Sequence, residues 1–241
     1  MRGRDLRFRI PTPDCASLHP GYARCPRTRL QAVARGVHRP TALSPRLSIV
    51  RAIDYHSHVT VAAKTRMNVD QYLVWAQSHP GRYELSDGEV VAMSPESAGR
   101  AAVKFAVQRA LLTSVQARRL PCHVLPDGMT VRVDETTAYE PDALVYCGAR
   151  LGPSAMEVPN PAIVVEVLSP STRRIDAAAK LAGYFRLPSV AHYLIVDPAK
   201  PLVVHHARGS GDTIITRVVT TGTIELDPPG MAVTLADIYA A

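Results

Sequence analysis

The chain has 241 residues, of which 46% are apolar, and a formal net charge of +7 from 28 basic and 21 acidic residues. This length and composition are typical of one globular domain with a tail, and no run of 18 apolar residues predicts a membrane span. The first five residues, MRGRD, do not begin an apolar segment long enough for a secretory signal, so we expect a cytoplasmic location.

Residues 1–66 form a basic, arginine- and proline-rich tail. They hold 13 Lys and Arg against 3 Asp and Glu, net +10, which leaves residues 67–241 with 15 basic and 18 acidic residues, net −3. A segment of this composition without periodicity is expected to be disordered or weakly ordered. It is either a basic arm for nucleic acid or an upstream extension that a native start at Met67 would omit. The charge of residues 67–241 argues against tight nonspecific DNA binding by the domain itself.

The four cysteines are Cys15, Cys25, Cys122 and Cys147, and no two of them form a Cys-x-x-Cys pair. Their spacing indicates neither a zinc site nor a disulfide framework, which fits a reducing cytoplasm.

The domain opens with signals for a helix and a hairpin. Asn68 with Gln71 makes a capping box for a short helix that runs to Gln77. Residues 82–93 are typical of a hairpin that turns at Asp87-Gly88. An amphipathic helix follows, and its apolar stripe comprises Val103, Val107, Ala110, Leu111 and Val115. A second hairpin is expected to turn at Asp127-Gly128.

A first carboxylate lies at the start of an apolar strand. Residues 139–146 read YEPDALVY, with Pro141 where its missing N–H costs least and Asp142 directly after it. An aspartate at this place is also a common turn or cap residue.

A second carboxylate interrupts a strand that is apolar on both faces. Residues 161–168 read PAIVVEVL, and such a run belongs in the middle of a covered sheet. Glu166 would be costly there unless it is paired or bound to a metal. An ion pair with a core arginine would also satisfy it.

A helix is expected after Ser171-Thr172, either of which can cap it, and it should end near Pro188. Asp176, Lys180 and Tyr184 are spaced at i, i+4 and i+8, so they share one face and Lys180 can point back at the strand end. The alternatives are a solvated Asp176–Lys180 pair and a packing role for Tyr184.

The C-terminal part begins with a strand over residues 193–196. Residues 202–206 and 213–219 are then typical of an antiparallel β extension, which ends in a short helical turn near Asp237.

Several of these motifs, in this order, resemble the Uma-two (Uma-type) restriction endonuclease family, a branch of the PD-(D/E)XK nuclease superfamily. The matching segments are RYEL and DGE at 82–89, EPDA at 140–143, VEVLSPST at 165–172, Asp176 with Lys180 and Tyr184, and YLIVDP at 193–198. The resemblance covers residues 67–241 and implies an α/β fold of the restriction-endonuclease type, with a mixed central sheet flanked by helices and a C-terminal antiparallel β extension.

The resemblance also implies a site and its chemistry. Asp142 and Glu166 would bind a metal ion with the backbone carbonyl of Val167, and Mg²⁺, or Mn²⁺ in its place, would be the cofactor. The superfamily's usual lysine would fall at Leu168, so Lys180 on the helix takes that role. Glu84 matches an acidic position beside the metal, although it can equally pair with Arg82 or a cross-strand neighbour.

One position departs from the family pattern. The family often has a histidine at the start of the long helix, where this chain has Gly99 or Arg100. Arg100 can contact a phosphate, but it cannot act as a neutral base or as a metal ligand.

The sequence thus predicts a Mg²⁺-dependent endonuclease that hydrolyses phosphodiester bonds of nucleic acid, with DNA as the expected substrate and no membrane partner. Cleavage of a duplex requires two strand cuts, so a homodimer is a reasonable expectation. The alternatives are a catalytically inactive nucleic-acid- or protein-binding module that keeps the nuclease fold, and a structural oligomer.

Overall fold

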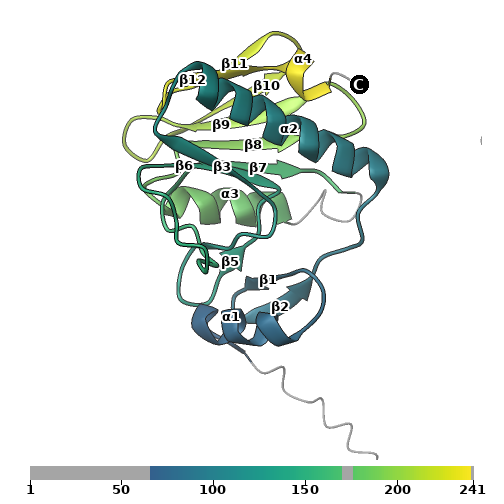
Figure 1. The fold of residues 1–241 in the computed structure, drawn as a ribbon, viewed down its shortest axis with the longest axis vertical. Coiled ribbons are helices and arrows are strands. Elements are labelled where there is room, and N and C mark those ends of the chain that lie inside the picture. The colour runs from purple at the N-terminus through teal and green to yellow at the C-terminus, as the bar shows by residue number, and fades with distance from the viewer. Residues whose placement is uncertain (1–65, 170–175, 240–241) are drawn as a thin grey trace, which may run out of the picture. The chain divides into compact units, whose positions relative to one another are not determined.

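The computed structural model describes residues 66–169 and 176–239, in which four helices and twelve strands alternate (Figure 1). In chain order they are α1 (Val69–Ser78), β1 (Tyr83–Ser86), β2 (Glu89–Ala92), α2 (Ala98–Ala117), β3 (Cys122–Pro126), β4 (Val131–Arg132), β5 (Ala138–Tyr139), β6 (Ala143–Cys147), β7 (Pro161–Val167), α3 (Asp176–Arg186), β8 (His192–Val196), β9 (Val203–Arg208), β10 (Ile214–Val219), β11 (Thr223–Leu226), β12 (Met231–Thr234) and α4 (Leu235–Tyr239). Within these ranges, none of the helices has the length and apolar character needed to cross a membrane. The predicted tail, apart from Arg66, and the predicted caps Ser171 and Thr172 lie outside the described residues.

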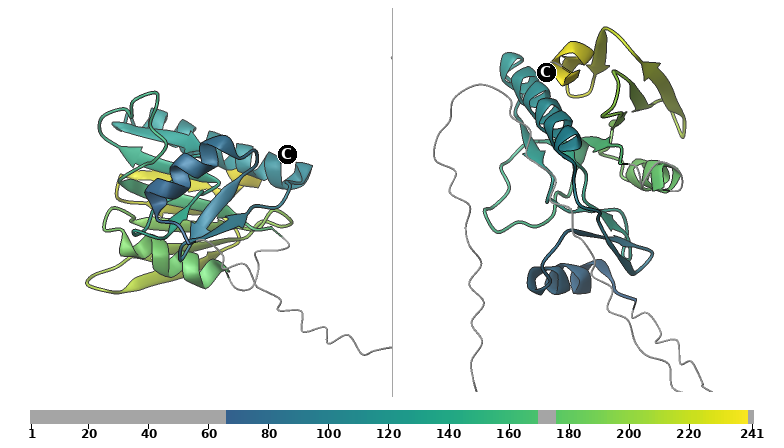
Figure 2. Two further views of the ribbon diagram at one scale, coloured as in Figure 1. Left: turned by 90° about the horizontal axis from the view of Figure 1, so that it is seen from below. Right: turned by 90° about the vertical axis from the view of Figure 1, so that its right-hand side faces the viewer.

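A mixed six-stranded sheet forms the centre of the domain, in the order β10-β9-β8-β7-β6-β3. Strands β7 and β8 run parallel, and the other neighbours run antiparallel. Helices α2 and α3 lie on either side of the strands (Figure 2). The expected α/β fold, with a mixed central sheet flanked by helices, is confirmed.

The side chains of β7 alternate between the two faces of the sheet. Ile163, Val165 and Val167 belong to the buried cluster that contains the apolar stripe of α2. Val164 belongs to the opposite cluster, which contains Tyr184 of α3. Because side chains alternate along a strand, Glu166 falls on the α3 face.

A second, four-stranded sheet, in the order β2-β1-β5-β4, carries α1 and the β1–β2 hairpin. The capping box of α1 forms as predicted, since the Asn68 side chain accepts from the Gln71 N–H and the Gln71 side chain accepts from the Asn68 N–H. The hairpin turns through Asp87 and Gly88 at φ values of 49° and 80°, the left-handed conformations that a two-residue turn of this kind requires.

The predicted hairpin at Asp127-Gly128 is wrong. Strand β3 pairs with β6 in the central sheet, whereas β4 pairs with β5 in the smaller one. The turn therefore carries the chain from one sheet to the other, and each flanking strand finds a partner that is distant in sequence.

The cysteine interpretation also needs correction. Cys122 and Cys147 stand directly opposite each other on β3 and β6 and form a disulfide across a separation of 25 residues. Disulfides are typical of oxidising compartments, so the cysteines no longer support a reducing location.

The C-terminal part follows the prediction and adds to it. Strands β9 and β10 extend the central sheet antiparallel to each other, and α4 forms around Asp237 as expected. The β11–β12 hairpin was not predicted, and it packs with α4 and α2 over one face of the sheet.

Candidate metal centre at the junction of the two sheets

Asp142 is held at the start of β6, against the end of β7. Its backbone N–H donates to the carbonyl of Val165 at 2.9 Å, and its Oδ2 accepts from the N–H of Val167 at 2.7 Å. The residue has no exposed surface, so its charge depends on protein partners.

Glu166 faces α3, as the strand period requires. Its Oε1 accepts from Lys180 Nζ at 3.0 Å and from the Tyr184 hydroxyl at 2.9 Å. These two donors are four residues apart on one face of the helix, so α3 holds the carboxylate from two successive turns. Tyr184, which we also considered a packing residue, is therefore a polar partner of the predicted site.

Glu84 reaches the same lysine from the smaller sheet. Its Oε1 lies 2.7 Å from Lys180 Nζ and accepts from the backbone N–H of Glu140 at 3.0 Å. Lys180 thus joins two carboxylates that are 82 residues apart in the sequence. The structure brings Glu84, Glu166 and Lys180 into direct contact and places Asp142 beside them.

Helix α2 supplies two cations to Asp142. Arg100 Nη2 lies 2.6 Å from Asp142 Oδ2, and Arg100 Nε donates to the carbonyl of Val167 at 2.9 Å. Lys104 Nζ lies 3.1 Å from Asp142 Oδ1 and 2.5 Å from a carboxylate oxygen of Asp127. Gln108, one turn further, donates to the Asp142 carbonyl at 3.0 Å.

Sequence reasoning missed Lys104 as a member of this cluster. The available signal was the i, i+4, i+8 spacing of Arg100, Lys104 and Gln108, which places three polar side chains on one helix face beside the apolar stripe. That spacing alone does not distinguish a solvated face from a face turned toward buried acids.

The ion pairs of the described residues form two neighbouring groups, and in each the acids outnumber the bases by one when all are ionised. The group around Asp142 has four acids and three bases, namely Glu96, Asp127, Glu140 and Asp142 with Arg82, Arg100 and Lys104. The group around Lys180 has two acids, Glu84 and Glu166, and this one base. An excess of negative charge attracts a further cation.

The electrostatics of Glu166 reflect this excess. Burial raises the pKa of Glu166 to about 7, Lys180 opposes the rise, and the charges of Glu84 and Asp142 reinforce it. A cation beside Glu166 would favour the ionised carboxylate and reverse this effect.

The oxygen atoms that could bind a metal are of the type that a hard divalent ion prefers. Asp142 and Glu166 offer carboxylate oxygens and Val167 a carbonyl oxygen, which are the ligand types that Mg²⁺ and Mn²⁺ accept. Asp142 Oδ1 is buried, and no described residue makes a well-formed hydrogen bond to it, although Lys104 Nζ is near. In the described parts of the chain, no three His, Cys, Asp or Glu side chains form a ready metal site, so the carbonyl and water would have to complete the shell.

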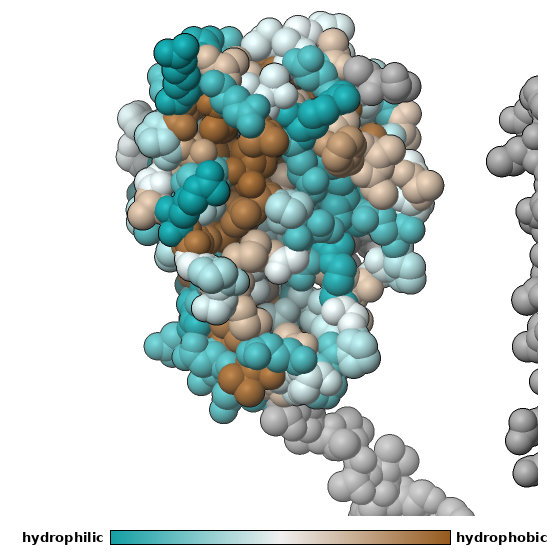
Figure 3. All heavy atoms as spheres, in the orientation of Figure 1, coloured by the Kyte–Doolittle hydropathy of each residue, from teal (hydrophilic) through white to brown (hydrophobic). Residues whose placement is uncertain are grey.

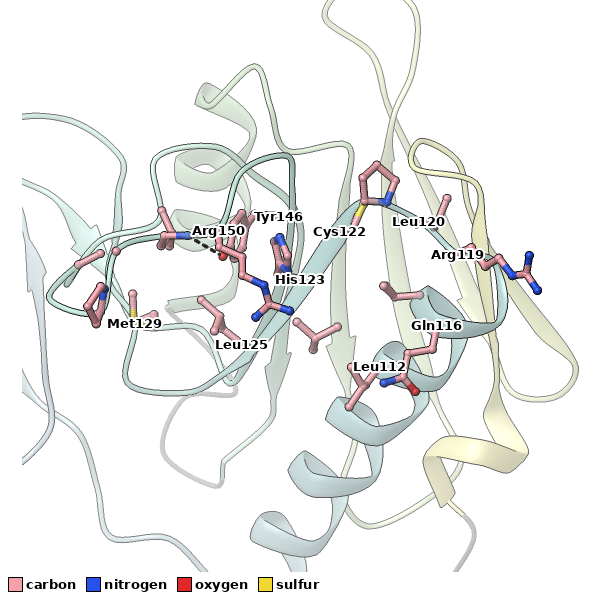
Figure 4. Close-up of a pocket in the computed structure, with 17 residues that line it drawn as sticks. Leu112, Gln116, Arg119, Leu120, Cys122, His123, Leu125, Met129, Tyr146 and Arg150 are labelled. Carbon is pink, nitrogen blue, oxygen red and sulfur yellow. Dashed lines mark hydrogen bonds between the residues drawn. The ribbon is translucent and has the colours of Figure 1, made fainter.

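The largest groove that we describe lies elsewhere. It has a volume of about 600 Å³ and opens between the C-terminal half of α2, β3 and the loop after β6, with Leu112, Leu125 and Met129 among its lining residues (Figure 4). An apolar strip follows this part of the surface (Figure 3). None of the acids or bases of the two groups of ion pairs lines the groove, so the candidate metal centre is separate from it.

The family of this chain follows from comparison with known proteins. The family model "Uma2: Putative restriction endonuclease" matches residues 69–236. Uncharacterized protein slr1290 of Synechocystis sp. (strain ATCC 27184 / PCC 6803 / Kazusa) is 25% identical over 185 residues, 76% of this chain and 96% of its own length. Uncharacterized protein sll1609 of the same organism is 24% identical over 164 residues, 67% of this chain and 92% of its own.

A solved structure shows the same fold. The crystal structure of "a putative nuclease belonging to DUF820" from Anabaena variabilis ATCC 29413 superposes with a TM-score of 0.57 at 13% identity, over 72% of this chain and 98% of that one. The family match runs from α1 into α4 and so includes both sheets and every residue of the candidate site. The chain therefore belongs to the Uma2 family, whose description is "Putative restriction endonuclease".

Proposed function

We propose that this protein is a metal-dependent endonuclease that hydrolyses phosphodiester bonds, with Mg²⁺ as cofactor and Mn²⁺ as a substitute. The observation that carries the proposal is that Glu166 bonds Lys180 and lies close enough to Asp142 for the charge of that carboxylate to help raise the Glu166 pKa. The family description and the description of the structural relative as a nuclease support the same reaction class.

Asp142, Glu166 and the carbonyl of Val167 would hold the ion. A bound Mg²⁺ supplies charge stabilisation at the phosphoryl oxygens and acidifies a water. Lys180 fixes Glu166 and Glu84 from α3, and its ammonium can orient the attacking water or balance charge that develops on the phosphate. The Tyr184 hydroxyl fixes the Glu166 carboxylate from the next turn.

We further propose DNA as the substrate and a homodimer as the state that cuts both strands. Light scattering of the purified chain with and without duplex DNA tests the dimer, and parallel digestion of DNA and RNA substrates of one sequence tests the substrate.

Plasmid cleavage tests the central activity. The full chain should nick supercoiled DNA only when Mg²⁺ or Mn²⁺ is present. Asp142→Asn or Glu166→Gln should lower the rate about 10²- to 10³-fold, because each removes a charge that acts in the transition state. Glu225→Gln, at an exposed acid of β11, is the matched control and should leave the rate unchanged. Equal cleavage by the wild type and Asp142→Asn would identify a contaminant and contradict the proposal.

A catalytically inactive binding module is the second candidate, and one observation favours it. The chain has Gly99 or Arg100 where the family often has a histidine, and Arg100 bonds both Asp142 and the Val167 carbonyl. Calorimetric titration with Mn²⁺ separates the two functions, since a binding module need not bind metal at a site that Glu166→Gln abolishes.

A further inference from the structure

The Arg100 guanidinium lies where the proposed metal ion would bind. It contacts Asp142 Oδ2 at 2.6 Å and the Val167 carbonyl at 2.9 Å, which are two of the three groups assigned to the ion. Its side chain is 11% exposed, so these bonds form largely away from water. Charge-assisted bonds of this kind are among the stronger hydrogen bonds in proteins.

Two cations cannot easily share the same pair of groups. Asp142 Oδ2 already accepts from the Val167 N–H at 2.7 Å as well as from Arg100. A divalent ion bound to the Asp142 carboxylate and to the Val167 carbonyl would lie next to the guanidinium and would repel it.

Arg100 has a further partner that it already holds, four residues earlier in the chain. Its Nη1 donates to Glu96 Oε1 at 2.9 Å, and the Glu96 side chain is 26% exposed. Arg100 is the third residue of α2, and Glu96 directly precedes the Ser97 N-cap. A movement that keeps the bond to Glu96 would release Asp142 and the carbonyl without leaving Arg100 uncompensated.

Asp142 would keep a cation after such a movement. Lys104 Nζ lies 3.1 Å from Asp142 Oδ1 and is anchored by Asp127 at 2.5 Å. The carboxylate therefore keeps a positively charged partner while Arg100 withdraws.

We propose that Arg100 is a built-in competitor for the metal centre, which occupies the cation position in the metal-free protein and must withdraw from Asp142, while it keeps its bond to Glu96, before a divalent ion binds. This inference rests on the proposed function, because it assumes that Asp142 and Val167 are metal ligands. Arg100 is on this account a regulatory residue that weakens metal binding.

Mn²⁺ affinity, measured by electron paramagnetic resonance of the free ion in the absence of nucleic acid, tests the inference without any activity assay. Arg100→Gln should bind Mn²⁺ about tenfold tighter than the wild type or more, because one charge-assisted hydrogen bond no longer has to be broken. Arg109→Gln removes the same charge from an exposed position of the same helix and should leave the affinity unchanged. Asp142→Asn should abolish the site in every background.

A second variant distinguishes an effect on metal binding from a loss of folded protein. Arg100→Lys keeps a positive charge but cannot bridge both oxygens as the guanidinium does, so its affinity should lie between those of the wild type and Arg100→Gln. Melting temperatures with and without Mn²⁺ provide an independent readout, and the ion should stabilise the Arg100 variants more than the wild type.

The possible failures are distinguishable. If Arg100→Gln binds Mn²⁺ no tighter than the wild type while Asp142→Asn abolishes binding, the metal centre stands and the competitor role is overturned. If Arg109→Gln tightens binding as much as Arg100→Gln, the effect is general electrostatics and the role is again overturned. If no variant binds Mn²⁺, the metal centre fails and the inference fails with it.

Discussion

Gly183 lies on the buried side of α3, directly before Tyr184, and shows how tightly the site's helix is packed. A Cβ built on Gly183 would meet the ring of Tyr139 at 2.8 Å. That ring is buried and packs edge-on against Tyr184 at a centroid distance of 5.3 Å, so it has little room to move. The glycine therefore permits the approach by which Lys180 and Tyr184 reach Glu166.

Gly183→Ala should lower the free energy of unfolding by about 1–3 kcal/mol, because overpacking outweighs the gain in helix propensity. Gly99→Ala is the matched control on α2, where an added Cβ has no neighbour within 4 Å. It should raise stability by about 0.5–1 kcal/mol. Urea unfolding of both variants checks the prediction, and equal shifts in the two would contradict the packing argument.

Two of the site residues, Glu166 and Lys180, could be predicted from the sequence alone. Glu166 could be singled out because a charge inside an apolar strand demands a partner. Lys180 could be linked to Glu166 because residues four apart in a helix lie on the same face, so that Lys180 shares a face with Tyr184. The contacts of Lys104 could not be anticipated, since its partners Asp127 and Asp142 come from a loop and a strand start.

At the scale of elements, local signals predicted local structure. The capping box of α1 and the Asp87-Gly88 turn are complete within a few residues, and both form. The turn at Asp127-Gly128 is locally similar, but β3 and β4 take their partners from different sheets. Pairing between distant strands depends on the whole fold, so this crossing was not predicted. The β11–β12 hairpin is local, but its four-residue connection between Leu226 and Met231 is not one of the two-residue turns that mark a hairpin most clearly.

The β8–β9 pair carries a buried histidine couple with a consequence for stability. His192 Nδ1 and His205 Nε2 lie 2.9 Å apart, an arrangement that requires one ring nitrogen to donate and the other to accept. Burial, reinforced by His192, Arg217 and His206, lowers the pKa of His205 to about 4. In the unfolded chain the pKa of histidine is about 6.5.

The native state should therefore lose stability as the pH falls below about 6.5, because only the unfolded chain takes up the proton. The loss should continue until the pH nears the folded pKa of about 4 and should amount to about 2 kcal/mol between pH 7 and pH 5. Urea unfolding at both pH values measures it. His205→Gln should flatten the dependence, whereas His79→Gln, at an exposed position, should not. An unchanged pH dependence in His205→Gln would show that other groups cause it.

At the scale of the whole molecule, the candidate site exists only because several elements converge. Glu84 comes from the smaller sheet, Asp142 and Glu166 from neighbouring strands of the central sheet, Lys180 from α3, and Arg100 from α2. The family resemblance had predicted that Asp142, Glu166 and Lys180 would lie near one another.

The central claim is that Asp142, Glu166 and the Val167 carbonyl bind one divalent ion, and a crystal structure grown with Mn²⁺ tests it most directly. The account predicts one anomalous peak bonded to oxygens of these three residues, with the Arg100 guanidinium withdrawn from Asp142. A peak only at other residues, or none at a saturating concentration with Arg100 still bonded to Asp142, would contradict the account.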